Sequence, residues 1–177
     1  MADIIRQRQI IADSWQLLES SADDGVTVPA AGDVIVPLAL WCAQRAALAT
    51  RAGRLGVWLD AHEDPAEIAL DLRHFELIAI NFPRFTDGRG YWIARLLRER
   101  YGWRRELRAV GDVLRDQLFY LARCGFDAFA LRAGQDAQAA LGAFADLSEA
   151  YQASAERTQP LFRRRDAVLP HAVLAQR

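Results

Sequence analysis

The sequence of 177 residues contains no lysine, only two cysteines and no apolar run long enough to cross a membrane. A transmembrane helix needs about 20 consecutive apolar residues. Cys42 and Cys124 are far apart and form no CxxC pair, so neither a disulfide framework nor a zinc ribbon is expected. All 22 basic residues are arginine. Because arginine takes every position that lysine could also fill, a single arginine is weaker evidence for an anion-binding site here than in most proteins.

Several common functional signatures are also absent. No GxGxxG motif and no P-loop follows the first predicted strand, so the sequence predicts no bound nucleotide cofactor. The loop after the second predicted strand contains Asp60, His62 and Glu63. Their spacing is not that of an HxH or HExxH motif, so we expect no metal site there. The formal net charge of −1 gives no reason to expect nucleic acid or an anionic membrane as a partner. The N-terminus carries charges too early for a signal peptide, which indicates a cytoplasmic protein.

The composition is that of a globular protein, with 52% hydrophobic and 25% charged residues. A chain of this length fits a single domain with a real core. We predict one α/β domain over residues 1–177. It comprises an N-terminal hairpin (1–16), a βα core (34–153) and a C-terminal tail (154–177), which is basic and then apolar.

Five short apolar runs alternate with helical patterns. The predicted strands are 34–40, 55–60, 77–82, 107–110 and 126–131. The predicted helices are 41–52, 64–73, 88–101, 112–125 and 133–153. Short strands alternating with helices predict about five βα units around a parallel sheet. The sequence leaves open whether they form a flavodoxin-like open sheet or a partial β/α barrel.

Charged residues follow the third predicted strand, in the loop PRFTDGRG. In a parallel α/β sheet, binding sites form outside the carboxyl ends of the strands. Arg84 and Arg89 in this loop have the forked geometry that suits a sulfate-like, phosphate-like or carboxylate anion. Alternatively, Asp87 caps the next helix and the arginines pair with nearby carboxylates.

The later strand ends add further candidates for an oxyanion site. Asp112 follows the fourth strand and is either a general base or the cap of the next helix. Arg115 lies one turn further on. Arg132 ends the fifth strand, where it either completes an anion pocket or pairs with Asp112 or Asp136. The candidate ligand-binding residues are thus Arg84, Arg89, Arg115 and Arg132, and the candidate catalytic residues are Asp87 and Asp112. Phe85, Tyr91 and Trp92 form either an apolar wall beside the arginines or a face for a partner protein.

Three stretches of the chain resemble one bacterial family. They read FPRFTDGRGYWIARLLRERYGW, ELRAVGDVLRDQLFYLARCGFDAFALR and YQ-SAER-QPLFRRR, and the sequence is similar there to domain-of-unknown-function family 934. The similarity extends over nearly the whole chain. Members are often encoded beside sulfite or nitrite reductase haemoprotein subunits and phosphoadenylylsulfate reductase, and some are labelled oxidoreductases. The resemblance therefore implies a role in sulfur assimilation, but it brings no agreed catalytic residues.

These observations lead to three hypotheses of function. The first is an accessory protein of assimilatory sulfite reduction, which binds sulfite reductase or another sulfur-assimilation enzyme, a small oxyanion, or both. The second is a small anion-binding enzyme of sulfur metabolism that uses the arginines and aspartates above. The third is a structural homo-oligomer, such as a homodimer, in which a second chain completes the sheet or barrel.

Overall fold

The computed structural model describes residues 3–19, 28–147, 150–155 and 157–166. Its centre is an eight-stranded sheet in the order β2-β1-β8-β7-β6-β5-β4-β3. The strands are β1 (Asp3–Arg6), β2 (Gln9–Ala12), β3 (Gln16–Leu17), β4 (Val34–Pro37), β5 (Leu55–Leu59), β6 (Leu77–Phe82), β7 (Glu106–Gly111) and β8 (Ala128–Phe129). Strands β3 to β8 are parallel, and the β1–β2 hairpin joins β8 in the antiparallel sense.

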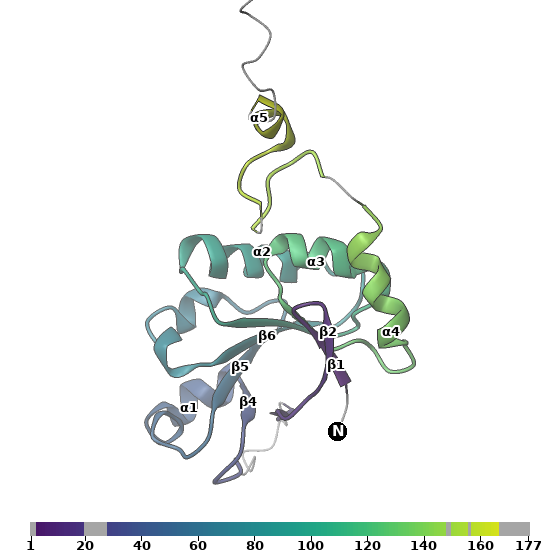
Figure 1. The fold of residues 1–177 in the computed structure, drawn as a ribbon. Helices are drawn as coiled ribbons and strands as arrows, with labels where there is room; N and C mark the ends of the chain where they lie inside the picture. The colour runs from purple at the N-terminus through teal and green to yellow at the C-terminus, as the bar shows by residue number, and fades with distance from the viewer. Residues whose placement is uncertain (1–2, 20–27, 148–149, 156, 167–177) are drawn as a thin grey trace, which may run out of the picture.

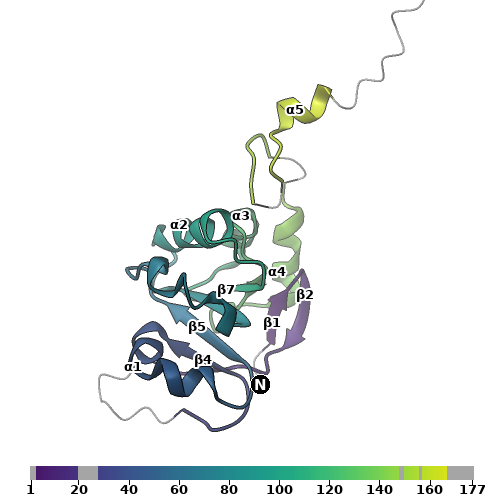
Figure 2. The same cartoon turned by 90° about the vertical axis from the view of Figure 1, so that its left-hand side faces the viewer.

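Helices connect most of the parallel strands. They are α1 (Leu38–Ala49), α2 (Arg89–Arg95), α3 (Leu118–Cys124), α4 (Ala137–Ala140) and α5 (Leu161–Asp166). A π-helical segment, Leu96–Arg100, continues α2. Helices α2 and α3 lie side by side over the sheet, whereas α5 stands apart from it (Figures 1 and 2). Among the described helices, none has the length and hydropathy needed to cross a membrane.

The predicted α/β class with a mainly parallel sheet and an N-terminal hairpin is confirmed. The parallel strands β4 to β8 lie side by side in chain order. A flavodoxin-like sheet reverses its strand order at a switch point, and this sheet has no such reversal. Parallel strands that follow one another in chain order are also the arrangement found in a β/α barrel, and here the sheet is one part of such an arrangement. Five regular βα units are not present, because β5 and β6 are joined by two short 3₁₀ turns in place of an α-helix.

Several predicted boundaries were wrong. The first core strand ends at Pro37, and α1 begins at Leu38, because proline has no N–H to extend the ladder and its φ suits a helix start. Strand β8 has two residues where six were predicted. The predicted helix 133–153 is reduced to α4 and a 3₁₀ turn, since Asp136 caps the chain at Gln138 and Ala139. The predicted tail lies partly outside the described residues, from 167 to 177.

Alternating side chains give the sheet two different faces. One face packs under the helices and holds the main core, including Val57, Ile80 and Leu107. The opposite face holds a smaller apolar cluster that includes Leu77 and Ala79. Because the side-chain period of a strand is two, neighbouring residues of one strand divide between these two faces.

The segment Asp13–Leu18, which includes β3, crosses this second face. It leads from the hairpin at one edge of the sheet to β3 at the other edge. Trp15 packs on the smaller cluster, and Trp58 donates its indole N–H to the Leu18 carbonyl at 2.9 Å. Trp15 also lies against the Arg54 guanidinium, whose carbon is 4.9 Å from the ring centroid. The N-terminal region thus covers the sheet face that has no helices.

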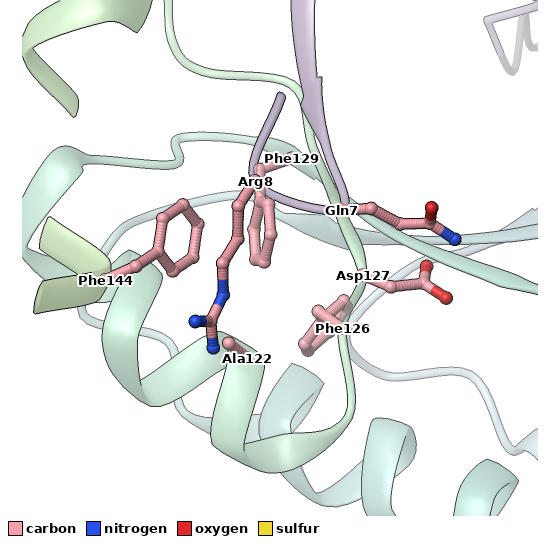
Figure 3. A pocket seen from close by; sticks show the side chains of 7 residues that line it. All are labelled: Gln7, Arg8, Ala122, Phe126, Asp127, Phe129 and Phe144. Atoms are coloured by element: carbon pink, nitrogen blue, oxygen red, sulfur yellow. The ribbon is translucent and has the colours of Figure 1, made fainter. Parts of the chain in front are cut away.

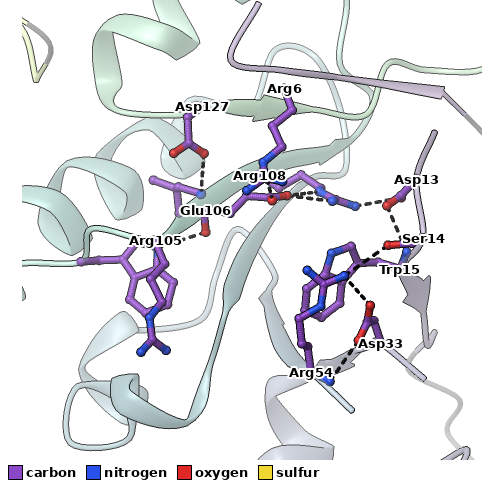
Figure 4. A network of polar contacts seen from close by, with 12 residues as sticks. Arg6, Asp13, Ser14, Trp15, Asp33, Arg54, Arg105, Glu106, Arg108 and Asp127 are labelled. Carbon is purple, nitrogen blue, oxygen red and sulfur yellow. Dashed lines mark hydrogen bonds and ion pairs between the residues drawn. The ribbon is translucent and has the colours of Figure 1, made fainter. Parts of the chain in front are cut away.

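A buried ion cluster attaches this segment to β7 (Figure 4). The Arg108 side chain is only 2% exposed and lies on the second face. It contacts Glu106 at 2.7 Å and Asp13 at 2.8 Å. Arg6 of the hairpin contacts the other Glu106 oxygen at 3.0 Å. Two guanidinium groups and two carboxylates therefore balance one another, with Arg108 and Glu106 buried and Arg6 at the surface, where its side chain is 44% exposed.

Candidate functional site

The ends of β5 and β6 meet at what we call the carboxyl edge, where the parallel strands terminate. Asn81 donates its side-chain N–H to Asp60 Oδ1 at 3.1 Å. The backbone N–H of Asp60 donates to Glu63 Oε2 at 2.6 Å, and His62 Nδ1 lies 3.3 Å from Asp60 Oδ2. Burial raises the pKa of the Glu63 carboxyl. The loop after β5 therefore gathers acidic and imidazole groups at one point of this edge.

Asp112 joins the ends of β6 and β8. One carboxylate oxygen accepts the Phe85 backbone N–H at 2.9 Å, and the other contacts Arg132 NH1 at 2.9 Å. The alternative that Asp112 caps the next helix is wrong, because the 3₁₀ turn begins at Arg115 and α3 only at Leu118. Of the alternatives for Arg132, the pairing with Asp112 is the one that the structure shows.

Sequence reasoning missed Gln117, which is almost fully buried in the same region. Its amide donates to the Phe85 carbonyl at 2.9 Å and to the Tyr91 hydroxyl at 3.1 Å. Its side-chain oxygen accepts the Leu114 N–H at 2.9 Å. The sequence does not distinguish a buried glutamine at the polar start of a helix from one that is exposed to solvent. Here it holds the loop after β6 against the start of α3.

The four candidate arginines do not converge on one pocket wall. Arg89 makes two bonds to Asp87, at 2.7 and 3.0 Å, and Arg115 contacts Asp146 at 3.0 Å. Arg84 is exposed in the loop after β6. With Arg132 on Asp112, three of the four guanidinium groups already have a carboxylate partner. An oxyanion site built from them stays a prediction.

The pair of Asp87 and Arg89 gives a testable titration. Hydrogen bonds from the Arg89 side chain lower the pKa of Asp87 from 3.8 to about 2. Because the folded pKa lies below the unfolded one, the pair stabilises the fold above about pH 3.8, and this contribution is lost as the pH falls through about 2.

We expect the substitution Arg89→Gln to move the Asp87 pKa back toward 3.8, as followed by carbon-detected NMR during an acid titration. The return is partial, since the backbone N–H of residue 89 still donates to Asp87 at 3.1 Å. Arg95→Gln serves as the control, because Arg95 pairs with Glu99. An Asp87 pKa that stays near 2 in the Arg89 variant would contradict this assignment.

A hollow of about 410 Å³ lies between the loop after β5 and α2. We call it the β5 hollow. Its lining residues are Ala61, His62, Glu63, Asp64, Arg89, Trp92 and Ile93. Trp92 is 61% exposed, whereas Ile93 is buried. The β5 hollow lies at the carboxyl edge, and its lining includes Arg89 but not Arg84, Arg115 or Arg132.

A second pocket, of about 350 Å³, lies near the start of β8 (Figure 3). Phe126, Phe129 and Phe144 line it, and the Arg8 guanidinium carbon lies 5.5 Å from the Phe144 ring centroid. The hairpin turn that presents Arg8 is strained, since Gln7 and Arg8 have φ values of 50° and 63°. The Gln7 N–H donates to the Asp127 carbonyl at 2.8 Å and holds this turn in place.

The remaining chemical groups give little support for redox or metal chemistry. Cys124 is buried, and burial raises the pKa of its thiol, which disfavours the reactive thiolate. Cys42 is exposed and lies on α1. Within the described ranges, no group of three or more His, Cys, Asp or Glu side chains is placed to hold a metal ion.

Comparisons with known proteins identify one family. No curated protein and no solved structure matches the chain. Residues 56–162, from β5 to α5, match the sequence model of a family described as bacterial protein of unknown function (DUF934). The matched region is well over half of the chain, and it contains the carboxyl edge, the β5 hollow and the helices α2 and α3. The chain therefore belongs to the DUF934 family of bacterial proteins.

Proposed function

We propose that this protein is an accessory protein of assimilatory sulfite reduction, and that it acts by binding sulfite reductase or another enzyme of sulfur assimilation. The observation that supports binding is a set of exposed aromatic side chains beside the carboxyl edge. Phe85 is 51% exposed, Trp92 61% and Tyr120 53%. Exposed aromatic residues grouped with arginines are typical of protein–protein interfaces. The metabolic context comes from the family resemblance.

Two of these aromatic residues, Phe85 and Tyr120, are connected through Tyr91. Tyr91 and Tyr120 pack edge to face with centroids 5.0 Å apart. Gln117 joins Tyr91 to the Phe85 backbone, as described above, and Trp92 follows Tyr91 on α2. We call Phe85, Tyr91 and Tyr120 the aromatic surface, whereas Trp92 lines the β5 hollow. Since Gln117 and Asp112 hold its backbone in place, a partner would bind it without having to order a loose loop.

A catalytic oxyanion site has less support from the geometry. Arg89, Arg115 and Arg132 each lie within 3.0 Å of a carboxylate, so an incoming anion would have to displace Asp87, Asp146 or Asp112. Arg84 alone is a weak anion site, because exposed ion pairs contribute only about 0–1 kcal/mol. A homodimer completed through the sheet edges β2 and β3 has no specific supporting observation.

Co-purification tests the proposal. The tagged full-length protein is expected to retain a sulfite reductase or a phosphoadenylylsulfate reductase from the same genome at moderate salt. Phe85→Ala and Tyr120→Ala should each weaken retention by about 10-fold or more, as expected for central aromatic contacts. Leu70→Ala is the matched control, since Leu70 is 90% exposed and belongs to the connection between β5 and β6. Absence of a complex with either enzyme would refute the proposed function.

A further inference from the structure

The β5 hollow combines an apolar floor with an acidic rim. Trp92 presents an exposed indole, while the apolar lining residues Ala61 and Ile93 are almost fully buried. Glu63 and Asp64 line the side that belongs to the loop after β5. An apolar surface next to carboxylates suits a long cationic side chain, whose stem packs on the floor and whose head stays at the rim.

The carboxylates of this rim retain hydrogen-bonding capacity. Glu63 uses Oε2 to accept the Asp60 N–H, and Asp64 uses Oδ1 to accept the Ala66 N–H. Among the described residues, Glu63 Oε1 and Asp64 Oδ2 accept no hydrogen bond. One oxygen of each carboxylate is therefore available to a donor that enters the hollow.

The charge balance of the hollow also favours a cation. Arg89 reaches the opposite wall, but its guanidinium makes two bonds to Asp87 outside the hollow and is neutralised there. Asp60 adds a further carboxylate next to the hollow, with Oδ2 3.3 Å from Nδ1 of the lining residue His62. Burial raises the pKa of the Glu63 carboxyl, whereas the Asp60 backbone N–H and the nearby His62 act in the opposite direction.

We propose that the β5 hollow binds an arginine side chain presented by the partner protein. The planar guanidinium stacks on the Trp92 indole and donates hydrogen bonds to Glu63 and Asp64. In its reference to a partner protein, this inference rests on the proposed function. It refines that proposal. The hollow selects a basic residue of the partner, whereas the contacts of the aromatic surface depend less on the partner's sequence.

Small probes test the hollow separately from the partner. The full-length ¹⁵N-labelled protein is titrated with Nα-acetyl-arginine amide, with the neutral Nα-acetyl-citrulline amide and with the acidic Nα-acetyl-glutamate amide. The indole N–H signal of Trp92 is assigned from its loss in Trp92→Leu. We expect saturable shifts of this signal with the arginine probe alone. Equal binding of the citrulline probe, or tighter binding of the glutamate probe, would overturn the inference.

Two variants identify the interacting groups. Glu63→Gln keeps an oxygen that can accept the Asp60 N–H but removes the charge, and it should weaken the arginine probe about 5-fold. Trp92→Leu keeps an apolar floor but removes the aromatic face, with a similar loss that is read from the His62 signals. Glu99→Gln, at the exposed far end of the π-helical segment, should leave binding unchanged. Unchanged affinity in both hollow variants would also overturn the inference.

The two proposals can fail independently. If the arginine probe binds at Trp92 but no reductase is retained, the proposed function fails and the arginine site stands. If a reductase is retained by the wild-type protein and equally by Glu63→Gln and Trp92→Leu, the arginine anchor fails and the accessory role stands. Loss of retention in Glu63→Gln, with retention unchanged in Glu99→Gln, supports both.

Discussion

Replacing Arg108 with methionine is expected to lower the free energy of unfolding by about 3–5 kcal/mol. The side chain is 2% exposed and is shared between Glu106 and Asp13. Methionine fills much of the volume but removes the guanidinium that Asp13 and Glu106 share, and Glu106 keeps Arg6 as an ion-pair partner. Removing one member of a buried ion cluster is costly because the remaining charges stay desolvated. Chemical denaturation monitored by circular dichroism measures the change.

Two further variants test this explanation. Arg95→Met removes an arginine whose pair with Glu99 is more than half exposed at both side chains, and should cost less than about 0.5 kcal/mol. Adding Glu106→Gln to Arg108→Met should restore part of the lost stability, since an uncharged amide is less costly to bury. A loss below about 1 kcal/mol in Arg108→Met alone would show that the cluster does not hold the N-terminal segment to the sheet.

Gly111→Ala should destabilise the protein by about 2–4 kcal/mol, which combines left-handed strain with overpacking. Gly111 ends β7 with φ at +92°. An added Cβ would lie 2.5 Å from the Phe82 carbonyl oxygen and closer still to the Asn81 side-chain oxygen. That clash would also push on the Asp112 N–H, which donates to the same Phe82 carbonyl at 2.7 Å. Thermal and chemical unfolding measure the loss.

Gly134→Ala provides the matched control. Gly134 has a similar φ of +85°, but nothing lies within 4 Å of the position an added Cβ would take. Only the backbone cost of about 1 kcal/mol is therefore expected there. Equal losses in the two variants would mean that the close approach at Gly111 contributes nothing. A larger loss at Gly111 identifies the tight junction of β6 and β7 as a determinant of the carboxyl edge.

The carboxyl edge was predictable in part. A turn-rich, charged loop after an apolar run indicates a strand end, and the parallel class places such ends together. The pairing of Arg132 with Asp112 was foreseen as one alternative. Gln117 was not predictable, because its three hydrogen bonds join groups that are up to 32 positions apart in the chain. The β5 hollow was missed for the same reason, since the chain brings Glu63 and Trp92 together only by folding.

Local signals determined the elements of this protein, and long-range packing determined how they are used. Apolar runs, caps and stop glycines predicted β5, β6 and the end of α3 at Gly125, because these depend on neighbours within a few residues. Only the tertiary structure decided the strand order, the shortening of β8 and the coverage of the second sheet face by Asp13–Leu18. These features depend on contacts such as Arg108 with Asp13, which are 95 positions apart and leave no periodic trace in the sequence.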